Sequence, residues 1–417
     1  MDRIIIKGGR PLMGAVRVSG AKNAVLPIIA ATLLCQGECV IQDVPRLKDV
    51  QVMLAVLEHL GATVSWEGDV LRVDTSVINS NEVSEELMRE MRASNLFLGP
   101  LLGRFGRARI SHPGGCNIGS RPMDLHLKGI QILGARILDH HGYITAEAPD
   151  LVGRDVHLDF PSVGATENIM MAAVFAQGTT LIHNAAKEPE IVDLQNFLNN
   201  AGASIKGAGT GTIRIEGMAR LGNCRHQVIP DRIEAGTHLV AGAITGGDVT
   251  VTNVIPEHVE PVIAKLREAG VEVTVKDDSV RVRARGRTQA VDVKTMPYPG
   301  FPTDMQAPFL AFLCLCEGTS VVHETIFEDR FKHVPELRRM GASVKIEGQT
   351  AIVRGMAYLG GATVQATDLR AGAALVLAGL AAENTTVIEQ PLHIDRGYDD
   401  LVGKYQKLGA MITRERD

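Results

Sequence analysis

The stretch Leu57-Glu58-His59-Leu60-Gly61-Ala62-Thr63-Val64-Ser65 decides the fold, because its pattern returns five more times along the chain. An amphipathic helix ends at a glycine, a small residue follows, and a strand with alternating apolar residues begins. Glycine is the expected residue after a helix, since it adopts the left-handed conformation without a Cβ penalty. The equivalent glycines follow one another at intervals of roughly 70 residues; they are Gly134, Gly202, Gly270, Gly341 and Gly409. The sequence therefore predicts six repeated units.

A second signature keeps step with the first. It is a small polar turn followed by a β-branched strand, as in GDVTVTN from Gly247 and GTSVVHE from Gly318. Each unit is therefore predicted to contain a helix, a strand, a loop, a second helix and a strand hairpin.

The sixth unit ends too early, because few residues follow Gly409. The missing strands are found at the other end of the chain. Residues 3–8 repeat the pattern of residues 350–355, and residues 14–18 repeat that of residues 362–366. We therefore predict that the amino terminus completes the last unit.

The length of 417 residues suits two domains better than one core. Three units form a predicted domain at 22–229, and the other three form a domain at 230–417 together with 1–21. The chain crosses between them near Ala21 and Pro230, which predicts a hinge and a cleft able to close around a ligand.

The composition excludes several classes of protein. A net charge of -5 argues against a nucleic-acid partner, since binding to a duplex normally draws on a basic face. The amino-terminal apolar run is too short for a signal peptide, and we expect no membrane span and a cytoplasmic location. The Ala-rich segment from Ala371 to Ala382 is interpreted as a buried helix.

The six cysteines form no CxxC pair, so neither zinc nor disulfides are expected. Five of them are predicted to be small core residues. Cys116 differs, because it lies in the Gly-rich polar loop 112–121, which only one unit carries. Such a loop suits a lid, and a thiol among backbone N–H groups beside Arg121 favours reactivity. The alternative is a surface cysteine without a function.

Polar residues recur at the start of the first helix in each unit. A helix start offers unpaired N–H groups and a positive dipole end, so these places are predicted to attract anions. They carry Lys22-Asn23, Arg92, Ser162-Val163-Gly164, Asp231-Arg232, Thr303-Asp304 and Asp368-Leu369-Arg370. The loops before the second helices add Arg121, Glu188, Arg330 and Arg396. For any single one, a helix cap or a surface salt bridge is the commoner explanation.

Six motifs together resemble the enolpyruvyl transferase family, in particular the UDP-N-acetylglucosamine 1-carboxyvinyltransferases, over essentially the whole chain. They are PGGCNIGSRPMDLH (113–126), SGAKNAVLP (19–27), SVGATE (162–167), FPTDMQA (301–307), ATDLRAGA (366–373) and HIDRGY (393–398). The cysteine-loop motif is the most specific, because the related enolpyruvylshikimate phosphate synthase lacks it. The resemblance implies an α/β fold, a two-domain inside-out α/β barrel with three units in each domain.

The resemblance also implies a reaction. The enolpyruvyl group of phosphoenolpyruvate is transferred to the 3-hydroxyl of UDP-N-acetylglucosamine and phosphate is released, as the first committed step of peptidoglycan synthesis. No metal or organic cofactor is implied. Cys116 is implied to be the general acid, able to form an adduct with phosphoenolpyruvate, and Asp304 the base for the sugar hydroxyl.

The implied substrate contacts fall at matching motif positions. Lys22, Arg121 and Arg396 are implied to bind the phosphate and carboxylate of phosphoenolpyruvate, with Arg370 nearby, and Asn23 to hold the sugar. The implied contacts of the nucleotide sugar are Arg92, Arg121, Pro122, Met123, Asp124, Leu125, Ser162, Val163, Gly164, Asp304 and Ile326. Some relatives have lysine where this chain has Phe160, so a charged contact to the nucleotide is in doubt there.

Three other interpretations stay open from the sequence. The chain could be the shikimate phosphate enzyme, or an RNA phosphate cyclase, which is expected to need ATP and a basic surface. It could also be a noncatalytic ring or clamp, which has no need for a thiol in an inserted loop. The sequence leaves the oligomeric state undetermined.

Overall fold

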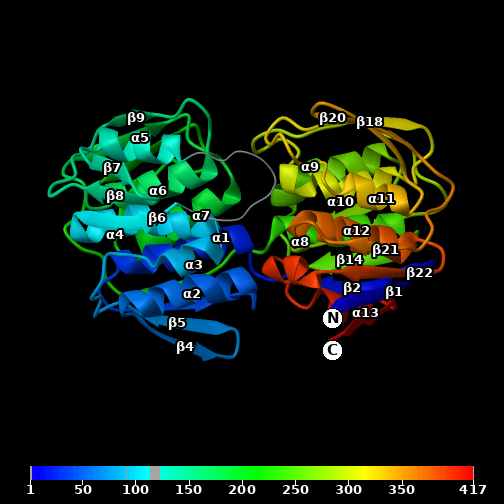
Figure 1. The fold of residues 1–417 in the computed structure, drawn as a ribbon, viewed down its shortest axis with the longest axis horizontal. Coiled ribbons are helices and arrows are strands. Elements are labelled where there is room, and N and C mark those ends of the chain that lie inside the picture. The colour runs from blue at the N-terminus through cyan, green and yellow to red at the C-terminus, as the bar shows by residue number, and fades with distance from the viewer. Residues whose placement is uncertain (1, 91, 113–122, 417) are drawn as a thin grey trace. The chain divides into compact units, whose positions relative to one another are not determined.

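The computed structural model describes residues 2–90, 92–112 and 123–416. The described residues separate into two compact units (Figure 1). One contains the described residues of 20–229, and the other contains 2–19 and 230–416. Each unit has its own hydrophobic core.

The unit at 20–229 alternates helices with strands in chain order. Its helices are α1 (Lys22–Ala31), η1 (Thr32–Leu34), α2 (Lys48–Leu60), α3 (Glu85–Glu90), η2 (Arg92–Phe97), α4 (Leu98–Phe105), α5 (Asp124–Ile132), α6 (Val163–Ala173) and α7 (Pro189–Asn200). Its strands are β3 (Glu38–Gln42), β4 (Thr63–Glu67), β5 (Val70–Asp74), β6 (Arg107–Ser111), β7 (Arg136–His140), β8 (Tyr143–Glu147), β9 (Asp155–His157), β10 (Thr179–His183), β11 (Ser204–Lys206), β12 (Thr212–Glu216) and β13 (Cys224–Gln227).

The other unit begins with two strands from the amino terminus. Its strands are β1 (Arg3–Lys7), β2 (Met13–Arg17), β14 (Asp248–Thr252), β15 (Glu272–Lys276), β16 (Ser279–Arg283), β17 (Val293–Lys294), β18 (Thr319–His323), β19 (Ser343–Glu347), β20 (Thr350–Arg354), β21 (Thr363–Gln365), β22 (Thr385–Glu389) and β23 (Met411–Glu415). Its helices are α8 (Arg232–Ile244), α9 (Pro256–Glu268), η3 (Thr303–Met305), α10 (Gln306–Leu313), α11 (Val334–Arg339), α12 (Leu369–Ala381), η4 (Pro391–Arg396) and α13 (Leu401–Lys407).

The sheets share one strand order. In the described part of the chain, five sheets have four strands: β13-β3-β5-β4, β11-β12-β10-β9, β15-β16-β14-β2, β17-β18-β20-β19 and β21-β22-β1-β23. In the first four of these sheets an antiparallel hairpin joins a third strand, and in the fifth β1 pairs antiparallel with both β22 and β23. In all five, another strand of the same unit lies parallel at one edge. The sixth sheet, β6-β8-β7, has three described strands and belongs to the repeat with the inserted loop.

The amino terminus completes the last repeat, as the sequence predicted. Strand β1 pairs antiparallel with both β22 and β23, so Ile5 lies opposite Val387 on one side and Thr413 on the other. Strand β2 pairs parallel with β14. Figure 1 shows these blue strands beside segments from the far end of the chain.

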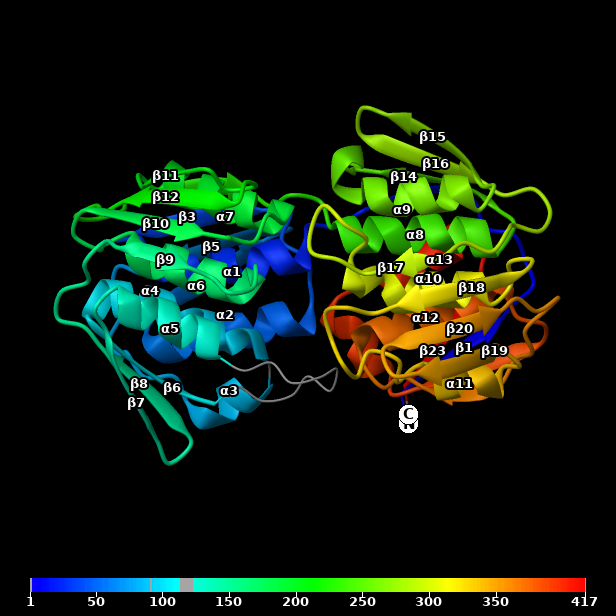
Figure 2. The same cartoon turned by 90° about the horizontal axis from the view of Figure 1, so that it is seen from above.

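The helices that open the repeats are almost wholly buried. In the unit at 2–19 and 230–416, these are α8, α10 and α12, which contact one another (Figure 2). Helices α10 and α12 are apolar or small on nearly every side, with the sequences QAPFLAFL and LRAGAALVLAGLA, and a helix that is hydrophobic all round is stable only when covered. The predicted buried helix over Ala371 to Ala382 is thereby confirmed as α12. No described helix is both long and apolar enough to cross a membrane.

The six glycines that define the repeat all have positive φ, which confirms their predicted role after the second helix of each repeat. The angles are 109° at Gly61, 105° at Gly134, 109° at Gly202, 87° at Gly270, 94° at Gly341 and 91° at Gly409. The five cysteines predicted to be core residues are free and buried; they are Cys35, Cys39, Cys224, Cys314 and Cys316.

Candidate functional site

The polar residues predicted at helix starts do occupy helix starts. Lys22 begins α1, Arg92 begins η2 and Thr303 begins η3, while Ser162, Asp231 and Asp368 are the N-caps of α6, α8 and α12. The cap interpretation holds for the last three. The Asp231 carboxylate, for example, accepts hydrogen bonds from the backbone N–H groups of Ile233 at 2.8 Å and Glu234 at 2.9 Å.

Asp304 is different, because its carboxylate is held by two arginine side chains instead of capping a helix. One oxygen lies 2.5 Å from Nη2 of Arg330, and the other lies 2.9 Å from Nη2 of Arg370. The arginine side chains are only 5% and 4% exposed, whereas that of Asp304 is 26% exposed. Two close guanidinium groups favour the charged carboxylate, and its partial exposure leaves it accessible.

Arg370 lies in an environment that keeps it charged in spite of its burial. Burial disfavours the cation, but Asp304, Tyr398 and Asp231 outweigh this and raise the pKa of Arg370. The guanidinium carbon lies 5.5 Å from the ring centroid of Tyr398, whose hydroxyl is 2.9 Å from Oγ1 of Thr237. The cation is therefore set in place by groups on three other segments.

Arg330 and Arg370 each have one side-chain N–H donor that makes no hydrogen bond to another described residue. Nη1 of Arg370 and Nε of Arg330 are buried and have no hydrogen-bond partner within the described ranges. Buried donors without partners are rare in folded proteins. A bound anion, such as a phosphate or carboxylate, would satisfy them.

Lys22 is held by a buried carboxylate in the unit at 20–229. Its Nζ lies 2.6 Å from Oδ2 of Asp49, and the two side chains are 10% and 4% exposed. Helix α1 positions Lys22 at its first residue, and α2 positions Asp49 at its second. Asn23 follows in α1 and is partly exposed.

Two segments predicted to contact the nucleotide are brought together by a glycine. A Cβ atom on Gly164 would lie 3.0 Å from Cε1 of His126, a tight contact, so glycine suits the close approach of the start of α6 to α5. His126 is buried, and its Nδ1 lies 3.0 Å from Nδ2 of Asn168. Residues 123–125 and 162–164 therefore lie at adjacent helix starts. Phe160, just before them, is 43% exposed.

For the remaining predicted site residues, the structure gives only a position in the fold, or they lie outside the described residues. Cys116, Arg121 and Pro122 lie outside the described residues, as does the side chain of Arg92. Arg396 ends η4 and is partly buried. Ile326 lies in the loop after β18 and is partly exposed.

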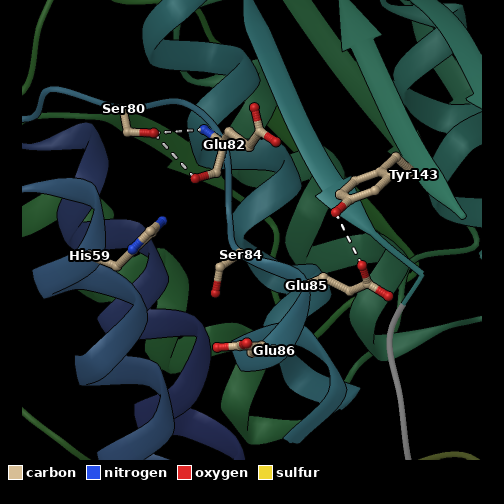
Figure 3. A pocket seen from close by; sticks show the side chains of 7 residues that line it. All are labelled: His59, Ser80, Glu82, Ser84, Glu85, Glu86 and Tyr143. Carbon is tan, nitrogen blue, oxygen red and sulfur yellow. Dashed lines mark hydrogen bonds between the residues drawn. The ribbon is translucent and has the colours of Figure 1, made fainter.

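A pocket of about 730 Å³ in the unit at 20–229 is lined by none of the predicted site residues (Figure 3). Its lining is His59, Ser80, Glu82, Ser84, Glu85, Glu86 and Tyr143. The Tyr143 hydroxyl donates to Glu85 at 3.2 Å, and Glu82 forms an ion pair with Arg109. Its acidic lining does not suit anionic substrates.

A buried ion cluster stabilises the first turns of α8. The Glu234 carboxylate forms an ion pair with Lys404, lies 3.1 Å from Nε2 of His238 and accepts a bond of 3.0 Å from the backbone N–H of Ser19. Burial alone would raise the pKa of Glu234, but His238 and Lys404 outweigh it and lower that pKa to about 2. The cluster ties residues from three parts of the sequence together.

Sequence reasoning missed two partners that the structure supplies. Asp49 was not singled out, although a carboxylate at the start of α2 is an ordinary helix feature and gave no signal. Arg330 was noted only for its place before a second helix. Its equivalence in the repeat to Arg121 and Arg396 was the signal that could have put it in the site.

The class of protein follows from the comparison with known families, which places the chain among the enolpyruvyl transferases. The sequence profile of EPSP synthase (3-phosphoshikimate 1-carboxyvinyltransferase) matches residues 6–405, and the chain belongs to this family.

Three similar proteins are named UDP-N-acetylglucosamine 1-carboxyvinyltransferase, and the one from Carboxydothermus hydrogenoformans carries the number 1 after this name. That of Carboxydothermus hydrogenoformans is 56% identical over 99% of this chain and 98% of its own length. That of Finegoldia magna is 55% identical over 99% of both chains, and that of Geobacter metallireducens is 53% identical over 100% of both.

Solved structures confirm the predicted inside-out α/β fold class. The enolpyruvyl transferase NikO from Streptomyces tendae is 27% identical, with a TM-score of 0.89 over 99% of this chain and 98% of its own. An EPSP synthase from Acinetobacter baumannii, 18% identical with a TM-score of 0.78 over 100% of both chains, shares the fold.

Proposed function

We propose that this chain transfers the enolpyruvyl group of phosphoenolpyruvate to the 3-hydroxyl of UDP-N-acetylglucosamine and releases phosphate. The observation that carries the proposal is the sequence identity of 53% to 56%, over nearly the whole chain, to relatives named UDP-N-acetylglucosamine 1-carboxyvinyltransferase. The geometry around Asp304 supports it, because a partly exposed carboxylate between two buried cations suits a base beside anionic substrates.

The proposed reaction is an addition followed by an elimination. Cys116 donates a proton to the methylene carbon of phosphoenolpyruvate, the sugar oxygen bonds to the neighbouring carbon, and Asp304 accepts the hydroxyl proton. The intermediate then loses a proton from the new methyl group to the Cys116 thiolate, which restores the thiol, while the carbon–oxygen bond to phosphate breaks. The enol ether is thereby restored, and inorganic phosphate leaves.

The cations of the site are assigned to the substrate charges. Lys22, Arg121, Arg370 and Arg396 would offset the phosphate and carboxylate of phosphoenolpyruvate, since guanidinium groups bind both in a bidentate manner. The buried Nη1 donor of Arg370 is the structural feature that most favours such a bound anion.

The nucleotide sugar is assigned to the adjacent helix starts at 123–125 and 162–164, with Asn23, Arg92, Arg121, Pro122, Asp304 and Ile326. The exposed ring of Phe160 would offer an apolar surface there in place of a charge. The reaction would belong to cytoplasmic peptidoglycan synthesis, and buried free cysteines are in keeping with a reducing compartment.

A phosphate-release assay tests the proposal. The purified chain should release phosphate only when phosphoenolpyruvate and UDP-N-acetylglucosamine are both present. Phosphate release with shikimate 3-phosphate in place of the nucleotide sugar would indicate the shikimate enzyme. Absence of release with either acceptor would refute an enolpyruvyl transfer and favour a noncatalytic scaffold.

A further inference from the structure

Glu324 is a fully buried carboxylate immediately after β18 that none of the assigned roles uses. Its Oε1 accepts hydrogen bonds from Oγ1 of Thr295 at 2.9 Å and from the backbone N–H groups of Ile326 at 2.9 Å and Phe327 at 3.2 Å. Its Oε2 accepts one from Oγ1 of Thr303 at 3.0 Å. The carboxylate thus gathers four donors.

The donors are all neutral. Among the described residues, no lysine, arginine or histidine forms an ion pair with Glu324, although burying a charge is costly without compensation. A carboxylate accepts on both oxygens and, when ionised, donates nothing. Glu324 can therefore orient four donors from three segments at once.

Those segments carry two groups of the proposed site. Thr303 directly precedes Asp304 in η3, and Ile326 lies in the loop that continues to Arg330. Oε2 of Glu324 therefore restrains the side chain of Thr303, the residue directly before the proposed base. Oε1 restrains the loop predicted to contact the nucleotide.

The loop has a second restraint on the Oε1 side. The backbone N–H of Thr325 donates to Oγ1 of Thr295 at 2.9 Å, and Oγ1 of Thr325 donates to the carbonyl of Thr295 at 2.6 Å. The loop is thus fastened to the end of β17 independently of Thr303. The two oxygens of Glu324 serve separable connections.

We propose that Glu324 is a positioning residue that aligns Asp304 through Thr303 and aligns the Ile326 loop through its other oxygen. This inference rests on the proposed function, because it concerns how the base and the nucleotide loop are held. Glu324 itself is buried and acts through its neighbours. A purely structural role would predict loss of stability without a selective effect on turnover.

The two oxygens lead to different kinetic expectations. Thr303→Val keeps the shape of the side chain but removes the donor to Oε2, so kcat should fall about 10-fold to 100-fold from a misplaced base. The KM for UDP-N-acetylglucosamine should stay close to that of the wild type. Thr295→Val removes both a donor to Oε1 and the acceptor of the Thr325 backbone N–H, so this KM should rise about fivefold to 100-fold, the equivalent of two hydrogen bonds.

The experiment measures kcat and KM from phosphate release, together with the melting temperature of each variant. Thr303→Ser restores the hydroxyl while losing the methyl group, so it should recover most of the kcat lost in Thr303→Val. Glu324→Gln should also lower kcat, because the amide has one acceptor oxygen and cannot accept from Thr303 while it serves the three donors on the Oε1 side. In the double variant Glu324→Gln/Thr303→Val, kcat should be no lower than in the worse single variant.

Several results would overturn the inference. Thr303→Val with the kcat of the wild type excludes positioning of Asp304, as does a Thr303→Ser variant no better than Thr303→Val. Multiplicative losses in the double variant show that Glu324 does not act through Thr303. A wild-type chain that releases no phosphate refutes the proposed function instead, which keeps the two failures distinct.

Discussion

Replacing Asp304 with asparagine tests the pair of arginines and the proposed base together. Asparagine keeps the size of the side chain but removes the charge that lies 2.5 Å from Arg330 and 2.9 Å from Arg370. Both cations then stay buried without their carboxylate. At these separations the Coulomb energy of a single pair is about 6 kcal/mol at an effective dielectric constant near 20.

The cost in stability follows from burial. Breaking a buried ion pair costs about 3–5 kcal/mol, because the remaining charge is left uncompensated. Asp304 is 26% exposed, so solvent weakens the pairs, and we expect a loss of about 3 kcal/mol. Loss of a general base should lower kcat by about 100-fold to 10,000-fold. Calorimetry and phosphate release measure the two effects.

Asp248→Asn is the matched control. Asp248 also contacts two arginines, at 2.6 Å from Arg281 and 3.7 Å from Arg283, but these side chains are 52% and 42% exposed. Exposed ion pairs contribute at most about 1 kcal/mol, so this variant should keep its kcat and nearly all its stability. An Asp304→Asn variant that behaves like Asp248→Asn would refute the reasoning about burial, and near-normal kcat alone would refute the base.

Three further predictions concern pH, a glycine and the inserted loop. The pKa of Glu234, lowered from 4.5 to about 2, makes it contribute on the order of 3 kcal/mol above about pH 5, lost as pH falls toward 2. The melting temperatures of the wild type and Glu234→Gln should therefore converge on acidification, and parallel curves would contradict this. Gly270→Ala should lower the free energy of unfolding, measured with a chemical denaturant, by about 1 kcal/mol. The φ of +87° is strained for alanine, although the added Cβ would have no neighbouring atom within 4 Å. Gly211→Ala, at a residue with an ordinary φ, should be nearly neutral. The epoxide fosfomycin should alkylate Cys116, and Cys116→Ser should bind UDP-N-acetylglucosamine with little phosphate release; a mass spectrum without an adduct on that peptide would count against the acid.

The repeat could be predicted because its signals are local. Each glycine after a second helix is visible from the residues around it, and positive φ at Gly61 and its five equivalents follows from the need to end a helix. The contribution of β1 to the last repeat could also be predicted, since residues 3–8 share the pattern of residues 350–355. A pattern of alternation identifies a strand even when the strand lies at the opposite end of the chain.

The site could be predicted only in part. The sequence placed polar residues at helix starts, and the structure confirms these positions. It did not show that Ser162, Asp231 and Asp368 act as caps while Asp304 does not. That distinction depends on which side chains come within hydrogen-bond distance after the helices pack.

By itself, the sequence determined the order of helices and strands, the glycine stops and the contribution of the amino terminus to the last sheet, because periodicity and capping act over a few residues. Only the tertiary structure decided which charged groups meet. Asp304 reaches Arg330 and Arg370 across 26 and 66 residues, and Glu324 gathers donors from three segments. Such meetings depend on how separate repeats pack, and a buried charge is stable only where that packing brings it partners.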